Sequence, residues 1–214
     1  MRPLKCEAPG DVGASHGGGK FSPYIYSANS PASEVIELIN ELRQCCPLLP
    51  HEKDLLLNNW GVPATSLTDI RIARVVFLSG GRFEFERYCQ NNEGCIDALI
   101  IRCLNLCCNQ VDLCACSLTF DQFGVWQGKI VLLGEENIFA PRIARPLAVH
   151  STPLEWLQAN RDGVVIVDLP RARALLQDAG PLAVKSAKFG RTLRTQLTVG
   201  PPQIMVIAPP EGEP

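Results

Sequence analysis

The sequence predicts an α+β protein in which N-terminal helices and a small antiparallel β-meander precede a C-terminal β-α-β-α-β-α-β unit with a mainly parallel sheet. Apolar residues recur at helical spacing early in the chain, alternate with charged residues in the middle, and form short β-branched runs between helical segments near the end. We expect a disordered tail at 1–30, helices and the meander at 31–139, the α/β unit at 140–208, and a disordered tail at 209–214.

Composition narrows the class of protein. The 214 residues are 46% hydrophobic and 20% charged, as in a folded domain. No apolar run approaches the roughly 18 to 20 residues of a membrane span, and the N-terminus lacks the apolar core of a secretory signal. We therefore expect a cytoplasmic protein without membrane contact, whose 10 cysteines stay reduced. Its net charge is −2, but basic residues outnumber acidic ones between 142 and 194.

The first half of the chain supplies the helices and the meander. Helical spacing predicts a helix at 33–46, stopped by Pro47, a second at 51–60 and a third at 66–73. Period-two alternation then predicts strands at 82–86, 98–103 and 111–116, with a further strand around 124–126. The second and third of these strands flank a polar turn and form a hairpin.

The α/β unit has clearer start and stop signals. A strand is expected at 146–149, and the signals for a helix start follow it. Thr152 is the expected N-cap, Pro153 takes the first helical position, and Glu155 completes a capping box. A buried strand at 163–167 precedes a helix that Pro170 opens and Gly180 closes. A strand at 182–184, a helix with apolar residues four apart, and a strand at 204–207 follow.

The last helix carries basic residues opposite its apolar face. Such a stripe neutralises phosphates and makes binding salt-dependent, although a solvated helix face has the same pattern. The candidate nucleic-acid-binding residues are Lys185, Lys188, Arg191 and Arg194, with Arg171 and Arg173 widening the patch if the fold brings them near.

A second hypothesis uses the C-terminal ends of the sheet strands, where α/β proteins place their ligands. His150, Ser151 and Asp168 follow predicted strands and are the candidate ligand-binding residues of a small-molecule-binding protein or enzyme. No G-x-S-x-G elbow accompanies them, and a lone histidine is often structural.

A third hypothesis is a zinc-stabilised interaction module. Its candidate ligands are Cys103, Cys107, Cys114 and Cys116 around the predicted hairpin. They lack the paired C-x-x-C spacing of a convincing zinc site, and buried cysteine also serves as a small apolar residue. The run Gly17-Gly18-Gly19-Lys20 lacks the other residues of a phosphate-binding loop. No cofactor is predicted.

The last 70 or so residues resemble a degenerate Toprim domain, the α/β metal-binding unit of primases and topoisomerases. The matching stretch is 183–191, in which Gly190 is kept and Lys185 and Ala187 stand at the two Asp positions of the family's D-x-D. His150 and Ser151 stand where the family's Glu follows the first strand. The segments at 60–62, 97–101 and 111–113 resemble the part that precedes Toprim in phage and plasmid primases, and 152–168 resembles a group of uncharacterised bacterial proteins associated with mobile elements.

The resemblance implies that this chain has lost the metal-dependent catalysis of the family. Toprim catalysis uses clustered carboxylates to hold Mg²⁺ against phosphate oxygens, and an ammonium at Lys185 repels that ion. The leading hypothesis is therefore a non-catalytic, primase-core-like protein that associates with DNA or RNA, or with a primase or helicase partner. The sequence leaves the oligomeric state open.

Overall fold

The computed structural model describes residues 32–90, 93–139 and 145–198. Its first elements are helical: α1 spans Ala32–Gln44, and α2, Pro50–Asp54, continues directly into a π-helical turn at Leu55–Asn59. The helices expected at 33–46 and 51–60 are confirmed. None of the helices in these ranges is both long enough and apolar enough to cross a membrane. The tails expected at 1–30 and 209–214 lie outside the described residues.

The helix expected at 66–73 is wrong. A 3-10 turn covers only Ala64–Leu67, and β2, Arg71–Leu78, begins soon after it. Along β2, Ile72 lies opposite Leu99 and Val75 lies opposite Ile96 in an antiparallel ladder. Cross-strand packing of these apolar residues outweighs the weak local preference for helix.

Five strands close into a barrel rather than an open meander. They are β2 and the four strands expected from the sequence: β3 (Arg82–Phe85), β4 (Ile96–Leu104), β5 (Gln110–Ser117) and β6 (Phe123–Val125). β2 pairs with both β3 and β4, β5 pairs with β4 and β6, and β6 runs parallel to β3, which closes the ring. Gly124 permits this closure, because a Cβ there would lie 2.9 Å from the backbone of Arg82. Two small elements flank the barrel: β1 (Cys46–Pro47), which pairs with β2, and a 3-10 turn at Glu86–Tyr88.

The C-terminal half has the expected alternation of strands and helices. In chain order it contains β8 (Leu147–His150), α3 (Pro153–Gln158), β9 (Val164–Ile166), α4 (Leu169–Asp178), β10 (Leu182–Ala183) and α5 (Ala187–Leu197). The sheet order is β10-β8-β9-β7, with β8 parallel to both β9 and β10. β7, Leu132–Leu133, pairs antiparallel with β9 and is followed by a 3-10 turn at Glu135–Asn137. The strand expected at 204–207 lies outside the described residues.

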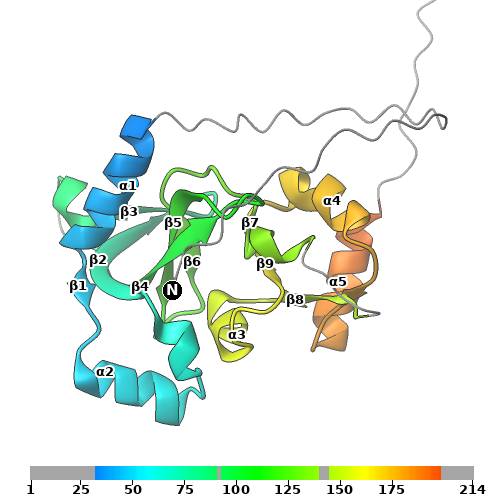
Figure 1. Ribbon diagram of the computed structural model, residues 1–214, viewed down its shortest axis with the longest axis horizontal. Helices are drawn as coiled ribbons and strands as arrows, with labels where there is room; N and C mark the ends of the chain where they lie inside the picture. The colour runs from blue at the N-terminus through cyan, green and yellow to red at the C-terminus, as the bar shows by residue number, and fades with distance from the viewer. Residues whose placement is uncertain (1–31, 91–92, 140–144, 199–214) are drawn as a thin grey trace, which may run out of the picture.

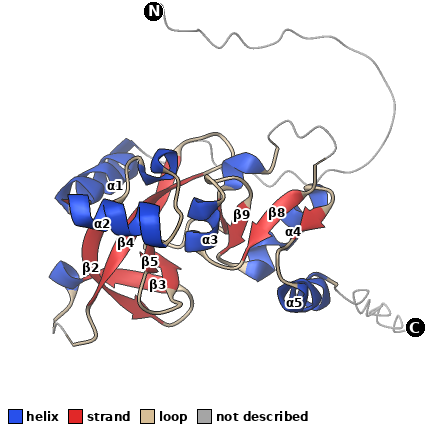
Figure 2. Cartoon of the chain, turned by 90° about the horizontal axis from the view of Figure 1, so that it is seen from below, coloured by secondary structure: helices blue, strands red, loops and turns tan. Residues whose placement is uncertain are grey.

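The two sheets share one hydrophobic core, and a separate cluster holds α5. Leu99 and Ile101 of the barrel belong to the same buried cluster as Trp156 of α3 and Val165 of β9. A separate cluster joins α4 and α5 to the C-terminal sheet, with Leu193 as the buried residue of α5. Figures 1 and 2 show α1 against the barrel and α5 at the opposite end of the molecule. Among the described residues α5 is therefore the last helix, and it lies at the end of the molecule opposite α1.

Candidate nucleic-acid interface

α5 forms because its cap and its apolar spacing agree. The Ser186 hydroxyl accepts a hydrogen bond from the Phe189 N–H at 3.3 Å, as an N-cap does. Phe189, Leu193 and Leu197 share one face and pack against the sheet. Gly190 lies so close to Val184 that a Cβ there would be 2.9 Å from the valine Cγ2. The helix is therefore held against the sheet by one face, and the opposite face meets solvent.

The exposed face of α5 is basic. Lys188, Arg191 and Arg194 are exposed on the helix, and Lys185 is exposed just before it. We call these four residues the α5 basic face. Within the described part of the chain, none of the four has a carboxylate oxygen within 4.0 Å, since the ion pairs there involve other residues. The stretch 179–198 contains no Asp or Glu. The positive charge is therefore not neutralised by residues of this stretch itself.

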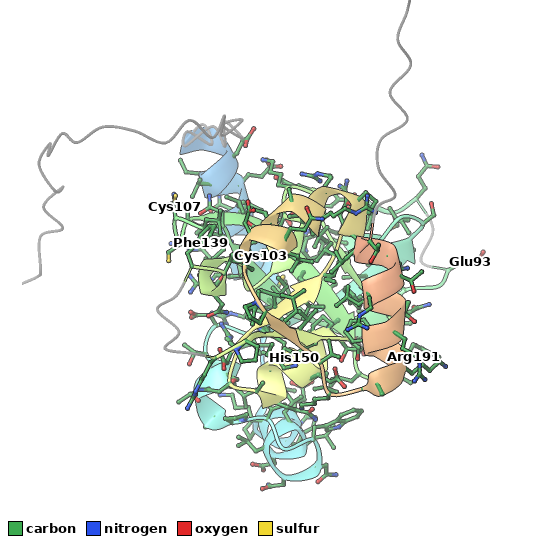
Figure 3. The ribbon with its side chains drawn as sticks, turned by 90° about the vertical axis from the view of Figure 1, so that its right-hand side faces the viewer. Glu93, Cys103, Cys107, Phe139, His150 and Arg191 are labelled. Atoms are coloured by element: carbon green, nitrogen blue, oxygen red, sulfur yellow. The ribbon has the colours of Figure 1, made fainter. Side chains whose placement is uncertain are left out.

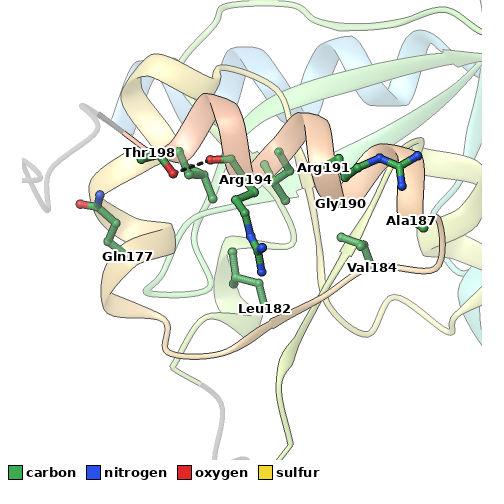
Figure 4. A pocket seen from close by; sticks show the side chains of 10 residues that line it. Gln177, Leu182, Val184, Ala187, Gly190, Arg191, Arg194 and Thr198 are labelled. Atoms are coloured by element: carbon green, nitrogen blue, oxygen red, sulfur yellow. Dashed lines mark hydrogen bonds between the residues drawn. The ribbon is translucent and has the colours of Figure 1, made fainter. Parts of the chain in front are cut away.

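The four cations do not all point the same way. Figure 3 shows Arg191 pointing away from the body of the molecule, whereas Figure 4 shows Arg194 reaching from α5 toward Leu182 of β10. Between the cations, Thr192 and Thr195 donate their hydroxyl protons to backbone carbonyls four residues earlier, at 3.2 and 3.0 Å. Their hydroxyl oxygens remain on the surface as acceptors. Positive charge, rather than hydroxyl donors, is what the face offers to a ligand.

Arg171 lies at a different place. Its Nη1 donates to the Gly128 carbonyl at 3.0 Å and lies 3.6 Å from the Asp168 carboxylate, at the start of α4. Arg173, two residues further along α4, instead contacts α5: its Nη2 donates to the carbonyl of Gln196 at 3.0 Å. Of the two arginines of α4 that the sequence offered for widening the patch, the one that approaches the basic helix is therefore Arg173.

The strand-end residues of the ligand hypothesis are occupied by structural contacts. His150 is 5% exposed, and its Nε2 lies 2.8 Å from the carbonyl oxygen of Asp162, to which it donates. Asp168 caps α4 by accepting a hydrogen bond from the Arg171 N–H at 3.1 Å. Ser151 donates its hydroxyl and its N–H to Glu155, at 2.7 and 2.9 Å.

Glu155 links this edge to Lys185. Partial burial opposes ionisation of the carboxyl, but the two hydrogen bonds from Ser151, with Lys185 and His150 nearby, outweigh it and lower the pKa of Glu155. The β8–β10 register pairs Leu147 with Leu182, so its continuation brings Lys185 level with His150. The Glu155 carboxylate therefore holds the entry to α3 and partly balances Lys185. Its capping-box position, three residues after Thr152, was the signal in the sequence.

The candidate zinc ligands do not form one group. Cys103, Cys114 and Cys116 are buried, whereas Cys107 is exposed in the turn between β4 and β5. Burial raises the pKa of Cys103 and Cys114 well above the ordinary value and that of Cys116 to about 12, so these thiols stay protonated. Across the residues with described positions, no group of three or more His, Cys, Asp or Glu side chains is arranged to hold a metal ion. The run at 17–20 lies outside those residues.

Comparisons with protein-family models, with curated proteins and with solved structures gave no match for this chain. What the protein does must therefore be inferred from its own residues. The described structure is an α+β fold with a closed barrel and a mostly parallel C-terminal sheet.

Proposed function

We propose that the protein is a non-catalytic, primase-core-like protein that binds nucleic acid through phosphate contacts at the α5 basic face. One observation carries the proposal. Four exposed cations gather on a segment without acidic residues, in a chain whose net charge is −2. An ordinary solvated helix usually mixes both signs of charge along its surface, and α5 does not.

Phosphate contacts suit the geometry of α5. Its 11 residues span about 16 Å, at a rise of about 1.5 Å per residue. Lys188 and Arg191 are three residues apart and so lie side by side on the helix. Such a stripe can follow a phosphate backbone but offers few groups that distinguish bases. The proposal is therefore one of binding with little dependence on sequence.

The proposal contains no catalytic step. At the strand end where the Toprim resemblance expects a pair of aspartates, this chain has Lys185 and Ala187. An ammonium group there attracts phosphate and repels Mg²⁺. The order β8-α3-β9-α4-β10-α5 agrees with the resemblance and supports the assignment of these positions.

Fluorescence anisotropy of the full chain with labelled single-stranded DNA, duplex DNA and RNA at low salt tests the proposal. Lys188→Glu combined with Arg191→Glu should weaken binding at least about tenfold, since like charges then face the phosphates. Arg43→Glu with Lys53→Glu makes the same change in net charge at exposed positions of α1 and α2 and should leave affinity within about twofold.

Two results would remove the proposal. One is the absence of binding to all three nucleic acids at low salt, which would leave an acidic replication partner as the remaining target of the basic face. The other is equal weakening by the α5 pair and the α1/α2 pair, because that would make net charge, and not the α5 surface, responsible. Lys188→Arg combined with Arg191→Lys should retain binding, since the charges are preserved.

A further inference from the structure

Two cysteines lie where the chain passes from β3 to β4. Val75 of β2 lies opposite Phe85 of β3 and also opposite Ile96 of β4, so these two residues flank it on its two sides. At the usual strand spacing of about 4.8 Å they are about 10 Å apart, and the chain crosses from one side of β2 to the other between them. Cys89 follows β3 by four residues, and Cys95 directly precedes Ile96. Both cysteines therefore belong to one crossing of β2.

A guanidinium ties the two ends of this crossing together. Arg74 of β2 forms an ion pair with Glu86 at 3.1 Å, and its Nη2 donates to the Cys95 carbonyl at 3.3 Å. The Cys89 N–H donates to the Glu86 carbonyl at 2.9 Å. The Cys89 thiol donates to the Phe85 carbonyl at 3.5 Å, back toward the end of β3. The turn that carries Cys89 is thereby held close to the start of β4.

The two thiols are in contact and are accessible. A hydrogen bond joins the side chains of Cys89 and Cys95. Partial burial, this contact and the carboxylates of Glu84 and Glu86 raise the pKa of Cys89. Both cysteines are free and partly exposed, and Glu93, which is two residues before Cys95, points away from the body of the molecule (Figure 3). A small molecule can therefore reach the pair from solvent.

We propose that Cys89 and Cys95 form a redox-active dithiol, which small disulfides of the glutathione type oxidise to an intramolecular disulfide. One deprotonated thiol attacks a sulfur of the small disulfide, breaks its S–S bond and releases one small thiolate, which leaves a mixed disulfide on the protein. The second thiol loses its proton and attacks the protein sulfur of the mixed disulfide. The Cys89–Cys95 bond then forms, and the second small thiolate leaves. The small disulfide accepts the two electrons, and its two thiolates take up the two protons.

Other cysteines of the described structure lack this combination of contact and access. Cys107 and Cys108 are exposed, but they are adjacent in the chain. Consecutive Cα atoms lie about 3.8 Å apart, below the roughly 4.4 Å at which disulfides usually begin. The cysteines within β4 and β5 are buried, and burial raises their pKa and keeps small disulfides away. The oxidation should therefore be selective for the Cys89–Cys95 pair.

Equilibration of the full chain with mixtures of reduced and oxidised glutathione tests the inference without nucleic acid. Acid quenching, alkylation and peptide mapping then give the effective concentration of the two thiols. In the urea-unfolded chain a short flexible segment joins them, and the value should be about millimolar. In the folded chain it should be at least about tenfold higher, because the fold holds the thiols in contact. By linkage, the oxidised chain should also have the higher urea midpoint.

Two variants test the geometry. Arg74→Ala removes the tie between the turn and Cys95 and should lower the folded-state effective concentration about two- to fivefold, as expected for a partly exposed ion pair. Arg71→Ala removes a guanidinium from the same strand, away from the crossing, and should leave the value unchanged. Cys95→Ser should leave Cys89 to form only a mixed disulfide with glutathione.

Three results would overturn the inference. The first is an effective concentration in the folded chain no higher than in the unfolded chain, since the fold would then not favour the bond. The second is separate glutathione groups on Cys89 and Cys95 in place of a bond between them. The third is a yield of the linked peptide that rises with protein concentration, which would indicate a disulfide between two copies of the chain.

Discussion

Asp112 should be among the most costly polar residues to remove. It is fully buried in β5, and its carboxylate accepts three backbone hydrogen bonds at 2.8 Å, from the N–H groups of Leu113, Gln127 and Lys129. Two of these donors belong to the connection between β6 and β7, so the carboxylate ties the barrel to the segment that leads into the second sheet. Asp112→Ala leaves all three donors without their partner.

The expected loss of stability follows from the number of N–H donors that lose their acceptor. Each buried donor left unpaired costs about 1–3 kcal/mol. Gln127 and Lys129 are partly exposed, so water replaces part of the loss, and we expect about 3–5 kcal/mol for Asp112→Ala. Asp112→Asn keeps one acceptor oxygen and turns an amide toward the third donor, so it should cost about 1–3 kcal/mol.

Urea unfolding followed by circular dichroism measures these differences. The midpoint should fall in the order wild type, Asn variant, Ala variant, with an unchanged slope. Replacement of the exposed Asp121 by Ala is the control and should change stability by less than about 0.5 kcal/mol. A cost below about 1 kcal/mol for Asp112→Ala would refute the assignment of this carboxylate as the link between the barrel and the second sheet.

Three further predictions concern a buried carboxyl, a glycine in close backbone contact, and the cysteine thiols. Burial raises the pKa of Glu135 against the hydrogen bonds it accepts from Val131 and Leu132. The folded state therefore favours the protonated carboxyl, and this contribution to stability is full below the ordinary pKa and is lost as pH rises through the folded value. Glu135→Gln should thus stabilise the protein at neutral pH and flatten this dependence in urea unfolding, and a loss of stability at neutral pH would contradict it. Gly163 has a φ of +86°, and the Ala148 carbonyl oxygen occupies the place of a Cβ, so Gly163→Ala should cost about 3 kcal/mol or more. Gly180, with a φ of +81° but open space around it, is the matched control, and an equal cost at both glycines would show that the close contact is unimportant. Burial also raises the pKa of Cys45 to about 11, so iodoacetamide mapping should label the exposed thiols far faster than the buried ones, and equal rates at Cys107 and Cys103 would contradict this.

The C-terminal half was largely predictable from its local signals. The apolar residues of α5 recur four apart after a serine cap, and α3 begins with Thr152, Pro153 and Glu155. Such signals act within one turn of helix and do not depend on distant contacts. The exposure of Lys188, Arg191 and Arg194 followed from the same pattern, since none of them stands at the apolar positions that pack against the sheet.

Other features depend on contacts between distant residues. The barrel closes through the pairing of Arg82 with Val125, where Gly124 allows the close approach, and no local pattern encodes that parallel contact. β7 has only two residues, Leu132–Leu133, too few for a periodic signal. Arg171 lies outside the predicted basic patch because its guanidinium contacts Gly128, a residue 43 positions away along the chain.

The salt dependence of nucleic-acid affinity tests the central proposal most directly. For duplex DNA, each phosphate contact contributes a slope of about −0.9 to log K against log salt. Four contacts give about −3.6, which is a loss of affinity of about 150-fold between about 50 and about 200 mM salt. Lys188→Ala combined with Arg191→Ala should make the slope less steep by about 1.8. A slope that does not change in this variant would contradict phosphate binding by the α5 basic face.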